Sequence, residues 1–253
     1  MTKLFIAGHS DSGDAYLPEG TVPWPERTRA WLEERTGSPC EVVAVRFAPT
    51  GERAVEYLIG AIEKAEPDIV ILPFGGYVFS IGTVAKNVGA RFGPRAECWF
   101  LRTEGSFQAR TGKRRLGRNV NRRGRWAARK ILGTRTMATV PQTMAIYTGI
   151  LQRLAQKESL QVLAVRDARF SAETQAREPG LHGKFDRMEA VLLPIVEQHH
   201  FALADLEGAL QRAPDRRVFH QDDGVHTTAA FHEVYFGVMQ EALAPLLPRL
   251  RED

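Results

Sequence analysis

The chain has 253 residues, of which 43% are hydrophobic and 25% charged, and its formal net charge is +4. This composition is typical of a globular protein and excludes a disordered or fibrous chain, while the length suits one large α/β domain. The first apolar run is too short for a secretory signal, and no run approaches the ~18 apolar residues of a membrane span. We therefore expect a cytoplasmic protein without a transmembrane segment.

Short β-branched and apolar runs alternate with segments of helical periodicity, which predicts strands separated by helices. In chain order, the predicted elements are a strand at 4–7, a helix at 25–35, a strand at 41–47, a helix at 51–64, a strand at 68–74, a helix at 142–156, a strand at 160–166, a helix at 184–198, a strand at 201–205 and a helix at 228–247. The continuous apolar runs at 69–72 and 162–165 are typical of strands covered on both faces. The alternation predicts a single domain over 1–253, a three-layer α/β/α sandwich around a five-stranded parallel sheet in the flavodoxin-like order 2-1-3-4-5.

One long segment interrupts this alternation after the third predicted strand. Residues 91–135 contain 14 of the 34 Lys and Arg residues but only two of the 30 acidic residues. A strongly basic segment is therefore set in a mildly acidic remainder. We interpret 91–135 as a basic insertion or lid within the domain.

Two loops rich in small residues follow predicted strands 1 and 3. In the order 2-1-3-4-5 the strand order reverses between these two strands, and ligands of open parallel sheets bind beyond the carboxyl ends at that point. Strand 1 runs into the loop at 8–13, and strand 3 runs into Gly75, Gly76 and Tyr77. The glycines also suit ordinary tight turns, so each loop alone leaves both explanations open.

A third loop, before the last predicted helix, carries Asp223 and His226. At this spacing the carboxylate can hold the imidazole Nδ1–H and leave Nε2 free as a base. A serine hydroxyl needs such a base to become a nucleophile, and Ser10 is the candidate because it follows strand 1 at the switch point. The alternative is that Asp223 caps the last helix and His226 is a solvated residue of its first turn.

Together these loops resemble the sequence blocks of SGNH (GDSL-type) hydrolases. Gly8-His9-Ser10 stands where the family has Gly-Asp-Ser, Gly51 matches the glycine of the second block, and Asp223-x-x-His226 matches the last block. The resemblance implies an esterase, a thioesterase or an acyltransferase with the catalytic triad Ser10, His226 and Asp223. It also implies that the backbone N–H groups of Ser10 and Gly51 hold the oxyanion.

The third block departs from the family pattern. It is normally Gly-x-Asn-Asp, whereas this chain has Gly75-Gly76-Tyr77-Val78, and His9 replaces the aspartate of the first block. Loss of one oxyanion donor typically costs about 10²–10³ in rate, a loss that the Tyr77 hydroxyl or His9 could offset. We expect His9, Gly75 and Gly76 to line the substrate site. A binding protein that kept the fold and lost turnover, with an acylated or phosphorylated ligand, remains the alternative.

The basic insertion admits several partners besides a solvated surface. Arg114, Arg115 and Arg118 could bind the phosphates of a coenzyme-A thioester or a phospholipid head group, or steer an acidic carrier protein. Nucleic acid could bind through its backbone phosphates, and Trp99 and Trp126 could stack on bases or anchor a helical lid. Because the insertion follows the strand-3 loop, we favour substrate or carrier recognition over nucleic acid.

Metal and nucleotide signatures are missing from the sequence. Cys40 and Cys98 form no CxxC pair, and the chain has neither a Walker A loop nor Gly-x-Gly-x-x-Gly after a strand. His220, His226 and His232 recur every six residues, whereas histidines that share a metal on a helix are three or four residues apart. We therefore predict no cofactor and no metal.

Overall fold

The computed structural model describes residues 1–8, 12–13, 17–80, 82–111, 127–128, 130–172, 174, 180–221 and 227–250, and among these the side chains of 104–111 and 249–250 are not described. The chain divides into two compact units. The first unit comprises residues 1–76 and 140–253, and the second comprises residues 77–139. The second unit thus has wider limits than the basic segment at 91–135.

The first unit is built on a parallel sheet in the order β2-β1-β3-β4-β5, which confirms the predicted topology. Its strands are β1 (Thr2–Gly8), β2 (Cys40–Arg46), β3 (Ile69–Pro73), β4 (Gln161–Arg166) and β5 (Ala202–Asp205). All five residues of β3 are buried, as expected for a central strand covered on both faces. The edge strand β2 alternates between more and less exposed positions.

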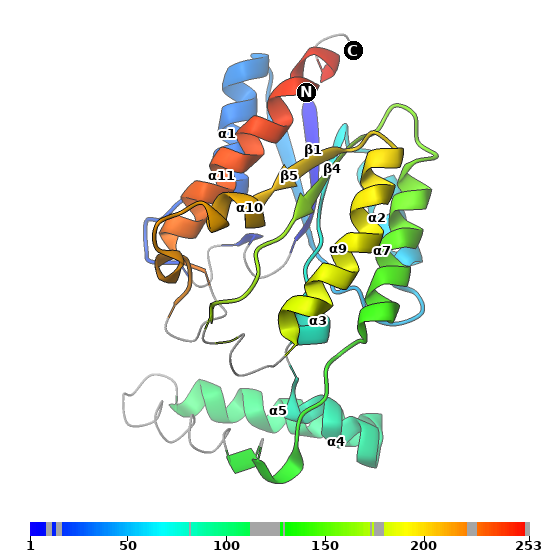
Figure 1. Ribbon diagram of the computed structural model, residues 1–253, viewed down its shortest axis with the longest axis vertical. Coiled ribbons are helices and arrows are strands. Elements are labelled where there is room, and N and C mark those ends of the chain that lie inside the picture. Colours follow the sequence, from blue (N-terminus) through cyan, green and yellow to red (C-terminus); the bar gives the residue numbers. More distant parts are fainter. Residues whose placement is uncertain are drawn as a thin grey trace. The chain divides into compact units, whose positions relative to one another are not determined.

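Helices cover both faces of this sheet, giving the predicted three layers (Figure 1). On one side lie α1 (Trp24–Thr36) and α11 (Ala229–Leu243). On the other side lie α2 (Ala54–Ala65), α7 (Val140–Leu154) and α9 (Leu181–Gln198). Short elements complete the unit: α10 (Leu206–Gln211) and the 3₁₀ helices η2 (Arg216–Phe219) and η3 (Ala244–Leu250).

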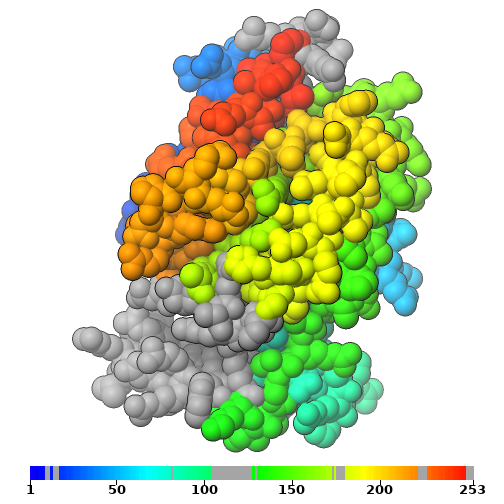
Figure 2. All heavy atoms as spheres, viewed as in Figure 1, coloured from blue at the N-terminus to red at the C-terminus, as the bar shows by residue number. Residues whose placement is uncertain are grey.

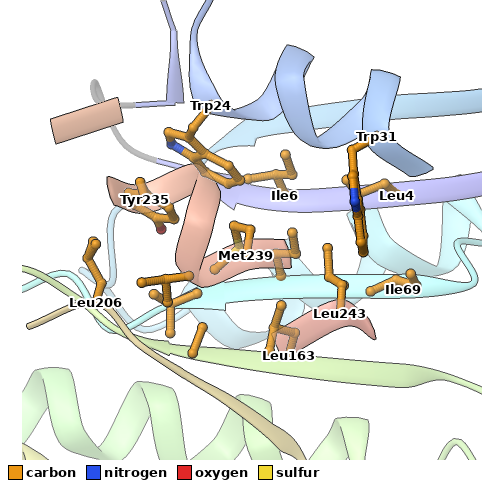
Figure 3. Close-up of a cluster of buried hydrophobic side chains, with 14 of the residues drawn as sticks. Leu4, Ile6, Trp24, Trp31, Ile69, Leu163, Leu206, Tyr235, Met239 and Leu243 are labelled. Atoms are coloured by element: carbon orange, nitrogen blue, oxygen red, sulfur yellow. The ribbon is translucent and has the colours of Figure 1, made fainter. Parts of the chain in front are cut away.

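The core between the sheet and the α1–α11 layer is dense and largely aromatic at one end (Figure 3). The Trp24 ring stacks on Tyr235 with a centroid distance of 4.2 Å and an interplanar angle of 3°. Ile6 of β1 and Met239 of α11 are both fully buried in the same cluster. The first residue of α1 is therefore fixed against α11, which positions the end of the loop that connects β1 to α1.

The opposite layer is closed by packing between α7 and α9. The space-filling view shows the side chains of α9 (yellow) lying against those of α7 (green) (Figure 2). Tyr147 of α7 is fully buried, and its hydroxyl donates to the carbonyl of Pro73 at the end of β3 over 3.0 Å. No helix among the described residues is both long and apolar enough to cross a bilayer.

The second unit contains α3 (Tyr77–Ser80), α4 (Val84–Phe92) and α5 (Pro94–Thr111). Two antiparallel backbone bonds, of 2.9 and 3.1 Å, join Thr83 to Arg135. They connect the residue before α4 to a residue near the end of the unit. Gly89 lets α4 and α5 approach closely, because a Cβ there would lie 2.9 Å from the Cβ of Glu97. Helical structure in the interruption therefore begins before the basic segment, at the residues directly after β3.

Candidate active site

The carboxyl ends of the strands are tied to one another just beyond the sheet. The Phe47 N–H, one residue past β2, donates to the Gly8 carbonyl at the end of β1 over 3.0 Å. The Phe74 N–H, one residue past β3, donates to the Val165 carbonyl of β4 over 2.9 Å. Because β1 and β3 are neighbours at the reversal of strand order, their ends form the edge at which this type of sheet binds ligands.

Ser12, four residues past the end of β1, lies close to that end. The Ser12 side chain packs so closely on the Gly8 Cα that a Cβ at position 8 would lie 2.7 Å from the Ser12 Cβ. Only glycine fits at the end of this strand without a shift of the loop. The predicted nucleophile Ser10 and its neighbour His9 fall between these two positions, outside the described residues.

The loop after β2 holds the second predicted oxyanion residue in a special conformation. Gly51 has a φ of +83°, in the left-handed region that disfavours residues with a Cβ. The loop and the start of α2 border an open hollow of about 600 Å³. The residues that line it are Phe47, Ala48, Thr50, Gly51, Glu52, Arg53, Ala54 and Tyr57. The structure thus places Gly51 at the predicted edge of the sheet, beside a space that a ligand could enter.

An aromatic cluster packs against the residues that follow β2 and β3. The rings of Phe47 and Phe74 each lie in a T-shaped arrangement with the Tyr147 ring, with centroid distances of 6.3 and 5.4 Å. Phe47 follows β2, Phe74 follows β3, and Tyr147 anchors both to α7. Edge-to-face packing of this kind fixes ring orientation, so the loops after these strands begin from rigid positions.

The turn before α11 is closed at its base by backbone and side-chain bonds. His220 and Thr227 form an antiparallel bridge, and the Thr228 N–H donates to the Phe219 carbonyl over 3.2 Å. The Gln221 amide donates to the Thr227 carbonyl over 2.9 Å. The predicted base and its partner, His226 and Asp223, belong to the segment between Gln221 and Thr227, which lies outside the described residues.

A buried carboxylate, Glu207, connects η2, which precedes this turn, to the loop after β4. Glu207 is fully buried on α10 and accepts the backbone N–H of Arg169, in the loop after β4, over 2.8 Å. It also accepts two bonds of 3.1 Å from the Arg216 guanidinium, at the start of η2. A buried charge with several donors is strongly destabilised if one partner is removed. Glu207 therefore fixes η2, which leads into the turn, against the loop after β4.

His232, in the first turn of α11, links the two chain segments that carry the predicted nucleophile and base. It is 1% exposed, and its Nδ1 accepts the backbone N–H of Trp24 over 3.2 Å. Nε2 therefore carries the proton and donates to the Thr227 hydroxyl over 3.4 Å. Trp24 ends the loop that leaves β1, and Thr227 ends the turn before α11. One imidazole thus ties these two loop ends together.

The buried His232 imidazole is expected to make the fold less stable in acid. Burial, together with the nearby Arg27 guanidinium, lowers the pKa of His232 from 6.5 to about 4. Between these values the unfolded chain binds the proton and the folded chain does not, so the free energy of unfolding falls as the pH drops from 6.5 to 4, by up to about 3 kcal/mol. Denaturant unfolding of wild type and His232→Asn across this range measures the effect.

In His232→Asn the amide oxygen can still accept the Trp24 N–H, but the side chain no longer titrates. The stability difference between wild type and variant should therefore shrink as the pH falls from 6.5 to 4. The comparison cancels the opposite contribution of Asp167, whose pKa is raised by burial to about 6 in both proteins. A stability difference that stays constant over this range contradicts a neutral buried His232.

The predicted site residues fall into three groups. Gly51, Gly75 and Gly76 lie at the carboxyl edge of the sheet in the first unit, and both glycines after β3 are buried. Tyr77 begins α3, in the second unit. Outside the described residues are His9, Ser10, Arg114, Arg115, Arg118, Asp223 and His226.

The sequence analysis assigned no structural role to three polar side chains near the site. Asp167 directly follows β4, so a search of every strand end for carboxylates would have found it. Burial raises the pKa of Asp167 to about 6. The bond that its carboxylate accepts from the Ala168 N–H lowers the pKa, and the nearby Glu207 carboxylate raises it. Glu207 and His232 gave no such signal, because the partners that show their role, Arg169 and Trp24, lie 38 and 208 positions away.

Solved structures of esterases and lipases resemble the whole chain in fold. TesA is 15% identical with a TM-score of 0.55, covering 97% of this chain and 99% of its own. The lipase/acylhydrolase from Enterococcus faecalis is 14% identical with a TM-score of 0.56, covering 97% of each chain. The psychrotrophic esterase EstA from Pseudoalteromonas sp., in a structure inhibited by monoethylphosphonate, is 13% identical with a TM-score of 0.53, covering 98% of this chain and all of its own. No protein-family model and no curated protein matches the chain. At these identities the likeness shows a shared fold.

Proposed function

Starting from the fold of SGNH-type hydrolases, which this chain has, we propose that it is a serine-dependent acyl hydrolase or acyltransferase acting on an ester or thioester. The observation that carries the proposal is the position of β1 next to β3 at the reversal of strand order. Ser10 comes two residues after the end of β1, and His226 comes one residue before Thr227. His232 joins the ends of these two segments through Trp24 and Thr227.

In the proposed reaction, the Ser10 hydroxyl attacks the carbonyl carbon of the substrate. His226 takes the hydroxyl proton through Nε2 and returns it to the leaving alcohol or thiol as the C–O or C–S bond breaks. Asp223 holds His226 Nδ1–H and so fixes the tautomer. Water or an acceptor nucleophile then attacks the acyl-Ser10 ester, giving up a proton to His226. The bond between the acyl carbon and the Ser10 oxygen breaks, His226 returns the proton to that oxygen, and the acid or the transferred acyl product is released.

The oxyanion that forms on the carbonyl needs donors fixed in advance. We propose the backbone N–H groups of Ser10 and Gly51 for this role. The left-handed φ of Gly51 and the open hollow beside it support this assignment. Tyr77, where the family has asparagine, and His9 complete the proposed set of polar groups, while Gly75 and Gly76 leave room for the substrate.

A fluorophosphonate probe tests the proposal, because it forms a covalent bond only with an activated serine. Wild type should be labelled on the peptide that contains Ser10, and both Ser10→Ala and His226→Ala should abolish labelling. Ser12→Ala is the matched control, since it removes a neighbouring hydroxyl of the same loop and should leave labelling unchanged. Labelling can be read by intact mass and peptide mapping.

Labelling that persists in Ser10→Ala would rule out Ser10 as the nucleophile. Complete absence of labelling in folded wild type would instead favour the binding protein that retained the fold without turnover. A panel of p-nitrophenyl esters and acyl thioesters, with and without an alcohol acceptor, then separates esterase, thioesterase and transferase activity.

A further inference from the structure

The second unit exposes large apolar side chains that a helical unit in water normally buries. Phe92 is 70% exposed, Trp99 67%, Leu101 51% and Ile131 78%. Single exposed apolar residues are common on protein surfaces. Four of this size within one small helical unit instead indicate a surface that contacts something other than water.

On α5, the exposed aromatic side chain lies between two arginines. One side of the helix packs on α4, where Glu97 pairs with Lys86 over 2.7 Å. Arg95, Trp99 and Arg102 are spaced by four and three residues and so share another face, and all three are exposed. We call these three residues the α5 stripe. It combines one large amphipathic ring with two cations on a single helical surface.

The cations of this surface pair with no acidic side chain that the structure describes. Among the described residues, Arg91, Arg95 and Arg102 make no ion pair, and the Glu97 carboxylate is already used by Lys86. The sequence from 91 to 135 contains only one other acidic residue, Glu104. Unpaired positive charge and exposed apolar side chains therefore occur together in the same unit.

We propose that the α5 stripe, with Phe92 and Ile131, binds the surface of an anionic lipid bilayer. Arginines are attracted to the negative head groups, and a tryptophan ring is most stable at the boundary between head groups and acyl chains. Exposed aliphatic side chains gain free energy by entering that boundary. A nucleic acid would neutralise the arginines but would give Phe92 and Ile131 no apolar environment.

Sedimentation with vesicles tests this surface on the full-length protein. Wild type should bind vesicles of phosphatidylglycerol and phosphatidylcholine at low salt, bind pure phosphatidylcholine at least tenfold more weakly, and release at high salt. Arg95→Gln/Arg102→Gln should weaken binding roughly 10- to 30-fold, and Trp99→Ser roughly tenfold. The matched controls are Arg187→Gln/Arg212→Gln and Val191→Ser, exposed positions of the first unit, which should change binding less than about twofold.

Equal binding to neutral and anionic vesicles would overturn the proposal, as would anionic binding that the α5 substitutions leave unchanged. Tighter binding to duplex DNA or to an acidic carrier protein than to vesicles, lost in Arg95→Gln/Arg102→Gln but kept in Trp99→Ser, would also overturn it and assign that partner instead. Ser10→Ala should bind vesicles like wild type, because the surface does not use the catalytic residues. Failure of the proposed acyl chemistry would therefore leave this result standing.

Discussion

Replacing Ser10 with alanine is expected to lower kcat on the best acyl substrate by about 10⁴- to 10⁶-fold, and His226→Ala by a similar factor. The two side chains act as one unit in the proposed mechanism, since the hydroxyl is a poor nucleophile without the base and the base has no proton to take without the hydroxyl. The double variant should therefore be within about tenfold of either single variant. Steady-state kinetics on a chromogenic ester measures all three.

The control for this cycle is His199→Ala. His199 is the C-cap of α9 and does not follow the carboxyl end of a strand, so its loss should leave kcat unchanged. Two contrary results are decisive. A double variant whose loss is the product of the single losses would mean that the residues act independently, and a His226→Ala variant close to wild-type activity would remove the proposed base.

The sheet could be predicted because its strands carry the information locally. The runs at 69–72 and 162–165 are apolar at every position, and such runs of four are too short for a helix and suit strands buried on both faces. The helices between them then fix a parallel sheet, because parallel strands need crossover connections. The predicted ends differ from the observed ones by a few residues, as in α2, which begins at Ala54 after the Gly51 turn rather than at Gly51.

The second unit was harder to predict because its longest described helix, α5, lacks a consistent apolar face. In α5 the exposed positions include Trp99 and Leu101, while a charged residue, Glu97, packs toward α4. Hydrophobic periodicity identifies a helix by the apolar face that it buries, so a helix that exposes apolar side chains gives a weak signal. Basic composition marked the segment as unusual without indicating where its helices begin.

The candidate site shows the same division between local and long-range information. Glycines at strand ends are visible in the sequence, and Gly51 indeed adopts a conformation that favours glycine. The support of the site depends on pairs that no local pattern reveals. Trp24 and His232 are 208 positions apart, and Arg169 and Glu207 are 38 positions apart. Such contacts become predictable only once the fold has brought the segments together.

Gly51→Ala is expected to lower kcat by about 10²–10³-fold with little change in KM, because it disturbs a proposed oxyanion donor. A Cβ at a φ of +83° costs about 1–2 kcal/mol, which the loop can relieve by rotating the peptide and turning its N–H away from the substrate. Space is not the obstacle, since a Cβ at Gly51 would meet no atom within 4 Å. The effect should therefore arise from backbone conformation alone.

Gly37→Ala provides a closely matched control for this substitution. Gly37 ends α1 with a φ of +69°, and a Cβ there would also meet no atom within 4 Å. Both variants should lose about the same stability, roughly 1–2 kcal/mol in denaturant unfolding, while only Gly51→Ala should lose activity. Equal activities in the two variants would show that the Gly51 N–H does not stabilise the transition state. The same backbone strain would then be present at both positions, and its presence in the loop after β2 would have no effect on catalysis.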